Sequence, residues 1–342
     1  MSKVALVVSG GGSKGAFAVG VLESLLERFP GFHFDILVGT SAGSLIVPFA
    51  AQSDMKALED VYHSVTTDGV ITKFSYTSRF FFNNDSLFSV KPLINLIDKH
   101  YTDDSFNALR KQKAAVYLAT TCLQTGKAVY FSNKKPPPAS DFTIELIEDG
   151  AMFRRAVLAS ASQPVFMPPV EIRPHATPIR QYVDGGMRQY AGIQLAVELG
   201  ADEIFAVILS CADNPPEDIN YNKVFPILVR ALDIFVSGVR DENVYIPQLF
   251  NSGVQYITNV QQRMRQAGIS EEKIDDFFDH QVSPFAHKAA VRLHILRPEA
   301  PLGGGPGGLE FDPAQMKAML AKGRNYMKGY LAELKCGDSV LV

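Results

Sequence analysis

Apolar positions recur along the chain with two different periods, which predict strands and helices in turn. The run Val4–Val8 is continuously apolar and rich in β-branched residues, as in a strand that is buried on both faces of a sheet. A second strand is predicted over residues 35–38, where three apolar residues follow Asp35. After the first run, apolar residues recur at helical spacing, at Phe17, Val21, Leu22, Leu25 and Leu26. The N-terminal part is therefore predicted to form a strand, a helix, a second strand and a second helix.

The rest of the chain continues this mixture. The pattern predicts strands over 114–122, 127–132, 204–209 and 291–296, the first two joined by a turn at Gly126. It predicts helices over 53–66, 89–100, 143–159, 222–264 and 313–334, with Ser89 as the cap of the second. The glycine-rich segment 301–308 is expected to be a flexible loop.

The second strand runs directly into Gly39-Thr40-Ser41-Ala42-Gly43, which fits the pattern G-x-S-x-G. A nucleophilic serine needs a sharp strand-to-helix turn to expose its hydroxyl, and the two glycines leave room for the strained backbone. The helix that follows directs its amide dipoles at the place where negative charge develops during acyl transfer. Ser41 is therefore the candidate nucleophile.

The first strand ends in a glycine-rich turn that runs from Gly10 to Gly15 and opens the next helix. Unpaired backbone N–H groups at such a place bind anions. One interpretation is an oxyanion hole for Ser41, with the amides of Gly11 and Gly12 as donors. The other is a phosphate cradle for a nucleotide, because the turn also fits G-x-G-x-x-G. The oxyanion hole fits better, because the second strand ends in the serine turn and not in the acidic residue that would hold a ribose.

A third motif, Asp184-Gly185-Gly186, places an acid at the end of a short predicted strand over residues 181–183. A fourth stretch, 159–169, reads Ala-Ser-Ala-Ser-Gln-Pro-Val-Phe-Met-Pro-Pro. With the glycine turn and the serine turn, these motifs resemble the patatin-like phospholipase family over most of residues 3–210.

The resemblance implies a three-layer α/β sandwich around a mixed, mainly parallel sheet. It also implies a Ser41–Asp184 dyad that hydrolyses lipid acyl esters without histidine, metal or cofactor. The dyad requires that exclusion of water raise the pKa of Asp184 towards the working range. Lys14 is expected either to fix the glycine turn, to attract a lipid phosphate or to be solvated.

Three alternatives to this hydrolase remain. An α/β-hydrolase triad could use Ser41 and Asp184 with His280, His287 or His294, although that fold places more strands before its serine. An acyltransferase would pass the same acyl group to an alcohol. A catalytically silent lipid-binding module would use neither residue.

Composition is consistent with a phospholipase A or lysophospholipase. The chain has 342 residues and a net charge of −3, which disfavours a nucleic-acid partner. Its three cysteines indicate free thiols in a reducing compartment. The absence of a leader or an apolar span predicts a cytoplasmic protein that contacts membranes transiently. Residues 1–210 are expected to form the catalytic core and 211–342 a mostly helical part packed on the same domain. The aromatic run Phe80–Phe82 is expected either to contact lipid or to pack in the core.

Overall fold

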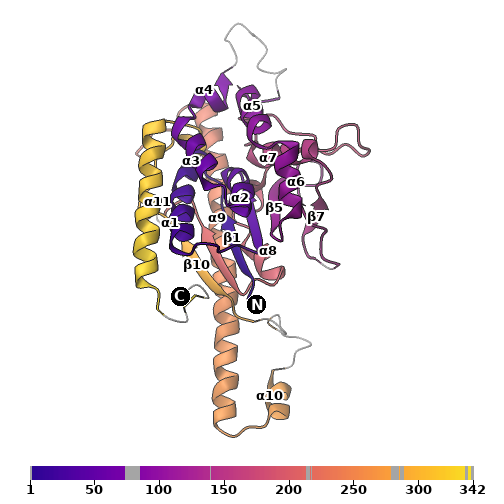
Figure 1. Ribbon diagram of the computed structural model, residues 1–342, viewed down its shortest axis with the longest axis vertical. Coiled ribbons are helices and arrows are strands. Elements are labelled where there is room, and N and C mark those ends of the chain that lie inside the picture. Colours follow the sequence, from indigo (N-terminus) through magenta and orange to yellow (C-terminus); the bar gives the residue numbers. More distant parts are fainter. Residues whose placement is uncertain are drawn as a thin grey trace.

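A computed structural model describes residues 2–73, 85–138, 140–212, 216, 218–278, 285, 289–335 and 338–339. Across this part of the chain, eight strands form one twisted sheet (Figure 1). Seven of them follow the order β10 (Arg292–Leu296), β9 (Glu203–Val207), β1 (Val4–Val8), β2 (Ile36–Thr40), β5 (Ala115–Cys122), β6 (Ala128–Ser132) and β7 (Thr143–Leu146). The strands from β10 to β5 are parallel, whereas β6 runs antiparallel to β5. The eighth strand, β8 (Tyr182–Asp184), pairs antiparallel with the end of β5.

Helices cover both faces of this sheet because alternate residues of each strand enter two different cores. Leu6 and Val8 of β1 pack on one face and Ala5 and Val7 on the other. The first face carries α1 (Gly15–Arg28), α2 (Ala42–Gln52), α3 (Met55–Ser64), α5 (Lys91–His100), α6 (Asp103–Lys111), α7 (Gly150–Ala161) and α11 (Pro313–Glu333). The second carries α8 (Ile193–Glu198) and part of α9 (Val224–Gln266). The predicted three-layer α/β sandwich is confirmed.

Short elements connect these layers. A two-stranded ribbon pairs β3 (Thr72–Lys73) with β4 (Phe88–Ser89), next to α4 (Thr67–Val70). Single 3₁₀ turns occur at Gly12–Lys14, Gly185–Met187 and Pro306–Gly308. Residues Phe80–Phe82, which the sequence singles out as aromatic, lie outside the described residues.

Two predictions about local structure are wrong. The helix expected over 143–159 begins only at Gly150, because Thr143–Leu146 adds a strand to the sheet beside β6. Asp149 then caps the helix by accepting a hydrogen bond from the Met152 amide at 2.7 Å. Ser89 does not cap α5, since it ends β4 and Val90 occupies the cap position.

The C-terminal part adds to the same sheet and core. Strand β10 extends the sheet beside β9, and α11 lies along α1. The two helices touch backbone to backbone, because a Cβ at Gly20 or Gly323 would overlap a carbonyl oxygen of the other helix. The domain division at residue 210 stays a prediction. None of the helices in the described ranges combines the length and the hydropathy that a membrane-spanning segment needs.

Candidate active site

Strands β2 and β8 meet end to end on one side of β5. Strand β2 is parallel to β5 and ends with Thr40 opposite Ala119, whereas β8 is antiparallel to β5 and ends with Asp184 opposite Thr120. The two strands therefore run towards each other and stop at consecutive residues of β5. This topology brings Ser41, which follows β2, next to Asp184, although 143 positions separate them in the sequence.

Ser41 sits on the sharp turn that its sequence motif predicts. Its backbone has φ 54° and ψ −120°, in the left-handed half of φ that residues with a side chain rarely adopt. Helix α2 begins at the next residue, and the Ser44 hydroxyl donates to the Ser41 carbonyl at 2.6 Å. The flanking glycines are required by space, because a Cβ at Gly43 would overlap the Val8 carbonyl and one at Gly39 would crowd the Gly43 carbonyl at 2.5 Å.

Asp184 is almost completely buried, at 6% exposure. Its carboxylate accepts a hydrogen bond from the Gly186 amide at 2.7 Å and also interacts with the Ser41 hydroxyl. Burial raises the pKa of Asp184 to about 6, because the charged form loses its hydration, and the interactions with Ser41 and Gly186 limit the rise. Gly185 is needed at the turn, since a Cβ there would lie 2.5 Å from the Ala119 carbonyl oxygen. Asp184 thus interacts with Ser41 and has a raised proton affinity.

The end of helix α7 holds both residues in place. The Ser160 hydroxyl donates to the Ala119 carbonyl at 2.6 Å and accepts from the Ser41 amide at 3.1 Å. Two residues later, the Ser162 carbonyl accepts a hydrogen bond from the Asp184 amide at 2.8 Å. The sequence identifies residues 159–169 only as a motif. Nothing in the local pattern shows that Ser160 contacts the turn after β2 and that Ser162 contacts β8.

The glycine turn between β1 and α1 lies beside Ser41. A Cβ at Gly10 would stand 3.2 Å from the Ser41 Cβ and 3.8 Å from its Oγ. Neither the Gly11 nor the Gly12 amide donates a hydrogen bond to another described residue. Gly12 has φ +57°, and the turn continues through Lys14 into α1 at Gly15, where a Cβ would overlap the Tyr62 hydroxyl. Two free donors are therefore available next to Ser41.

A second glycine-rich segment packs on this turn. Gly303, Gly304, Gly305, Gly307 and Gly308 all have φ between +63° and +88°. Backbone touches backbone here, because a Cβ at Gly12 would overlap the Gly308 carbonyl and one at Gly308 would overlap the Gly11 carbonyl. The Gln163 side chain donates to the Gly307 carbonyl at 2.8 Å. The segment expected to be a flexible loop thus packs its backbone against the candidate oxyanion hole. We name residues 303–308 the glycine clamp.

An apolar cavity of about 90 Å³ contacts Ser41 and Gly12 on the side of the first helical layer. Its wall is almost entirely hydrocarbon and comes from several helices and from the segment after the glycine clamp: Leu45, Phe49, Leu58, Val65, Val70, Leu93, Ile97, Met167, Leu309 and Phe311. His100 also lines it, and burial lowers the pKa of that imidazole. Such a wall fits an alkyl chain and disfavours a charged ligand.

Lys14 points to a different environment. Burial lowers the pKa of its ammonium, while the nearby Asp233 raises it and Arg240 lowers it again. Both neighbours belong to α9, on the other face of the sheet from the apolar cavity. In the described part of the chain no three His, Cys, Asp or Glu side chains gather as metal ligands would.

Of the three histidines that the triad alternative could use, the structure describes His294, which lies outside the candidate active site. His294 lies on β10, three strands from β2, and its ring nitrogens face Glu203 at 2.9 Å and Tyr330 at 2.7 Å. His280 and His287 lie outside the described residues.

Comparison with known proteins identifies the family of this chain. Residues 6–197 match the patatin-like phospholipase family, so the chain belongs to that family of lipid hydrolases. The match contains all the motif glycines, Ser41 and Asp184. Among solved structures, the chain is similar to VipD from Legionella pneumophila, at 11% identity over 97% of this chain and 67% of that chain, with a TM-score of 0.40. No match is found among curated proteins.

Proposed function

We propose that this protein is a lipid acyl hydrolase of the phospholipase A or lysophospholipase type, with Ser41 as nucleophile and Asp184 as base. The observation that supports it most is that the Ser41 hydroxyl interacts with a buried carboxylate whose pKa is raised by burial to about 6. A base of that pKa is charged at neutral pH and still accepts a proton readily. The family match supplies the substrate class, and the apolar cavity beside Ser41 supplies a place for the acyl chain.

In the proposed acylation step, the Ser41 oxygen bonds to the ester carbonyl carbon while its proton moves to Asp184. Negative charge develops on the carbonyl oxygen, where the Gly11 and Gly12 amides stabilise it. The carbon–oxygen bond to the alcohol then breaks, and the alcohol leaves with the proton from Asp184. The product of this step is an ester between Ser41 and the acyl chain.

Deacylation follows the same steps, with water as the nucleophile in place of the Ser41 hydroxyl. Asp184 takes a proton from water as the hydroxide oxygen bonds to the acyl carbon, and the same two amides stabilise the oxyanion. The bond to Ser41 breaks, the serine recovers its proton, and a fatty acid leaves. These residues account for both half-reactions, so the proposal needs no cofactor.

The experiment measures ester hydrolysis and fluorophosphonate labelling of purified variants. Ser41→Ala and Asp184→Asn should each lower turnover on the order of 10³-fold or more, and the double variant little further, because the two residues act as a unit. Fluorophosphonate should label the wild type and not Ser41→Ala. The control is His100→Phe, which changes the histidine on the cavity wall and should keep labelling. Full turnover by Ser41→Ala would refute the proposal.

A further inference from the structure

Helix α9 carries apolar side chains on two separate faces. Val244 and Val254 are buried on the face that packs on the protein. Phe285 packs against Phe250 with the two rings tilted and their centroids 4.8 Å apart, and so covers one side of the helix. A second set of side chains is exposed along the whole helix: Val224, Ile227, Leu228, Ile234, Phe235, Tyr245, Ile246, Leu249 and Tyr256. A helix needs only one apolar face to pack on its own domain.

The second half of α9 presents these exposed residues in a regular seam. Tyr245, Leu249 and Tyr256 are 62%, 56% and 71% exposed. With Glu242, Ser252, Asn259 and Arg263 they alternate in steps of three and four residues, the spacing by which one helix meets another along its length. We name these seven positions the α9 seam. It extends for roughly 33 Å at the rise of an α-helix.

We propose that the α9 seam is a homodimer interface, in which the same helix of a second copy packs antiparallel about a two-fold axis between Ser252 and Gly253. Leu249 and Tyr256 are equally far from this midpoint on opposite sides, and so are Glu242 and Arg263. A two-fold axis there places each Leu249 against the other copy's Tyr256 and each Glu242 against the other copy's Arg263. Apolar residues thus meet near the centre and opposite charges meet at the ends.

Charge decides between the two directions of pairing. Glu242 and Arg263 are both exposed, and neither forms an ion pair with another described residue. A parallel pair would bring Glu242 onto Glu242 and Arg263 onto Arg263, and like charges at a helix seam disfavour pairing. In the antiparallel pair each Glu242 meets an Arg263 of the other copy, so both contacts are attractive.

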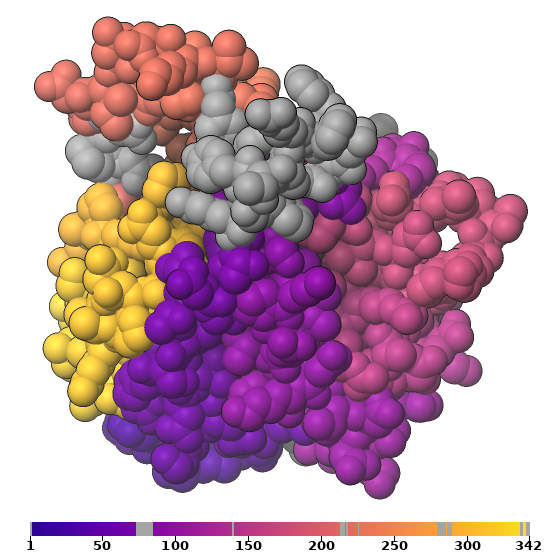
Figure 2. All heavy atoms as spheres, turned by 90° about the horizontal axis from the view of Figure 1, so that it is seen from above, coloured from indigo at the N-terminus to yellow at the C-terminus, as the bar shows by residue number. Residues whose placement is uncertain are grey.

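The position of the seam favours a protein partner over a lipid surface. Val70 of α4 and Leu93 of α5 line the active-site cavity, and these helices lie at one end of the molecule. The second half of α9 extends past the opposite end of the sheet, towards α10 (Glu271–Phe277) (Figure 1). Only the first half of α9 lies at the cavity end, where it projects at one edge of the molecule seen from above (Figure 2). A membrane that meets the cavity therefore lies far from the α9 seam.

The test measures molar mass by size-exclusion chromatography with light scattering at micromolar concentrations of the full chain. The wild type should be a dimer, whereas Leu249→Glu and Tyr256→Glu should be monomers with unchanged circular dichroism. The matched control is Leu228→Glu, an exposed apolar residue of the same helix beyond the paired stretch, which should remain a dimer. A monomeric wild type would overturn the proposal, and a monomeric Leu228→Glu would overturn the position of the axis.

A charge swap tests the direction of pairing. Glu242→Arg and Arg263→Glu should each weaken dimerisation about tenfold or more, because each creates two like-charge contacts across the axis. The double variant should restore the dimer. If the double variant is as weak as either single one, Glu242 does not face Arg263 and the antiparallel arrangement is wrong. Binding of the wild-type monomer to lipid vesicles through Leu249 would likewise contradict the proposal.

Discussion

At the scale of single residues, Asp184 shows how burial creates reactivity. A carboxyl in water has a pKa near 3.8 and is a weak base, whereas burial raises the pKa of Asp184 to about 6. Interactions with the Gly186 amide and the Ser41 hydroxyl keep this rise moderate because both favour the charged form. The result is a group that is mostly ionised at neutral pH and accepts a proton far better than an exposed aspartate does.

Activity should therefore depend on pH through Asp184. Only the carboxylate accepts the serine proton, so kcat/KM for a short soluble ester should fall as the pH drops through about 6 and level off above about 7.5. The measurement is a pH–rate profile at constant ionic strength. A profile that remains flat down to about pH 4.5 would contradict the raised pKa.

At the scale of helices and strands, the sequence predicts those elements whose conformation is determined by the local hydrophobic pattern. Continuous apolar runs predict β1 and β2, and the serine turn lies where its motif predicts it, between β2 and α2. Thr143–Leu146 was misassigned to a helix, because its strand state depends on pairing with β6. The meeting of β2 and β8 on β5 and the contact of the glycine clamp with Gly12 join segments far apart in sequence. Such contacts leave no periodic signal.

The end of α7 offers a matched pair of serines. The Ser160 hydroxyl bonds to the Ser41 amide and to β5, whereas the Ser162 hydroxyl bonds only to Leu158 within its own helix, at 2.8 Å. Ser160→Ala should lower kcat about tenfold, because the Ser41 turn loses a buried support, with little change in KM. Ser162→Ala should keep kcat near the wild-type value. Equal effects of the two substitutions on kcat would show that Ser160 does not position Ser41.

The glycine clamp offers a second matched pair. Gly303 and Gly308 both have positive φ, so alanine strains the backbone at either position. Only at Gly308 would the new Cβ overlap the Gly11 carbonyl, while at Gly303 it meets the flexible Gln315 side chain at 3.4 Å. Gly308→Ala should therefore displace the oxyanion donors and lower kcat about 10²-fold, and Gly303→Ala should not. Steady-state kinetics on a soluble ester, with melting temperatures for both variants, measures the difference.

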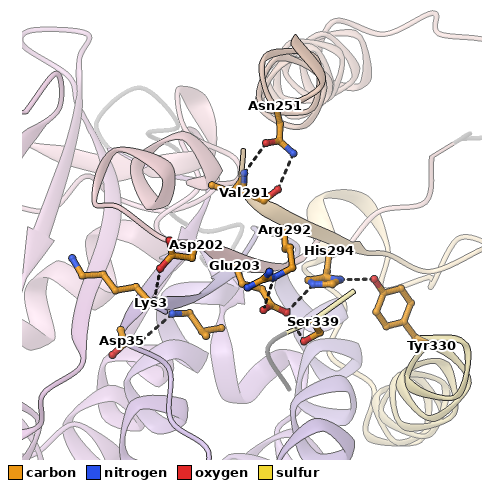
Figure 3. A network of polar contacts seen from close by, with 11 residues as sticks. Lys3, Asp35, Asp202, Glu203, Asn251, Val291, Arg292, His294, Tyr330 and Ser339 are labelled. Carbon is orange, nitrogen blue, oxygen red and sulfur yellow. Dashed lines mark hydrogen bonds and ion pairs between the residues drawn. The ribbon is translucent and has the colours of Figure 1, made fainter. Parts of the chain in front are cut away.

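At the scale of the whole molecule, a buried acid connects the sheet to the C-terminal part. Glu203 on β9 is fully buried and accepts hydrogen bonds from the His294 ring at 2.9 Å and from Ser339 (Figure 3). Arg292 on β10 lies 3.3 Å from the same carboxylate. The other His294 nitrogen faces the Tyr330 hydroxyl of α11 at 2.7 Å. One side chain thus links two strands, a helix and the region near the C-terminus, far from Ser41.

This network separates the roles of histidine in stability and in catalysis. In the wild type, the His294 ring stacks on Phe205 with the ring centroids 4.5 Å apart. His294→Phe keeps an aromatic ring at this position but removes both hydrogen bonds of the imidazole. The free energy of unfolding should fall by about 1–3 kcal/mol, because Glu203 and Tyr330 each lose a buried partner. Below the melting temperature, kcat should stay within about twofold of the wild type, since a Ser–Asp dyad does not use this imidazole. Urea denaturation and ester hydrolysis measure the two effects on the same sample, with exposed His33→Phe as the control. A folded His294→Phe variant that is as inactive as Ser41→Ala would replace the dyad with a triad.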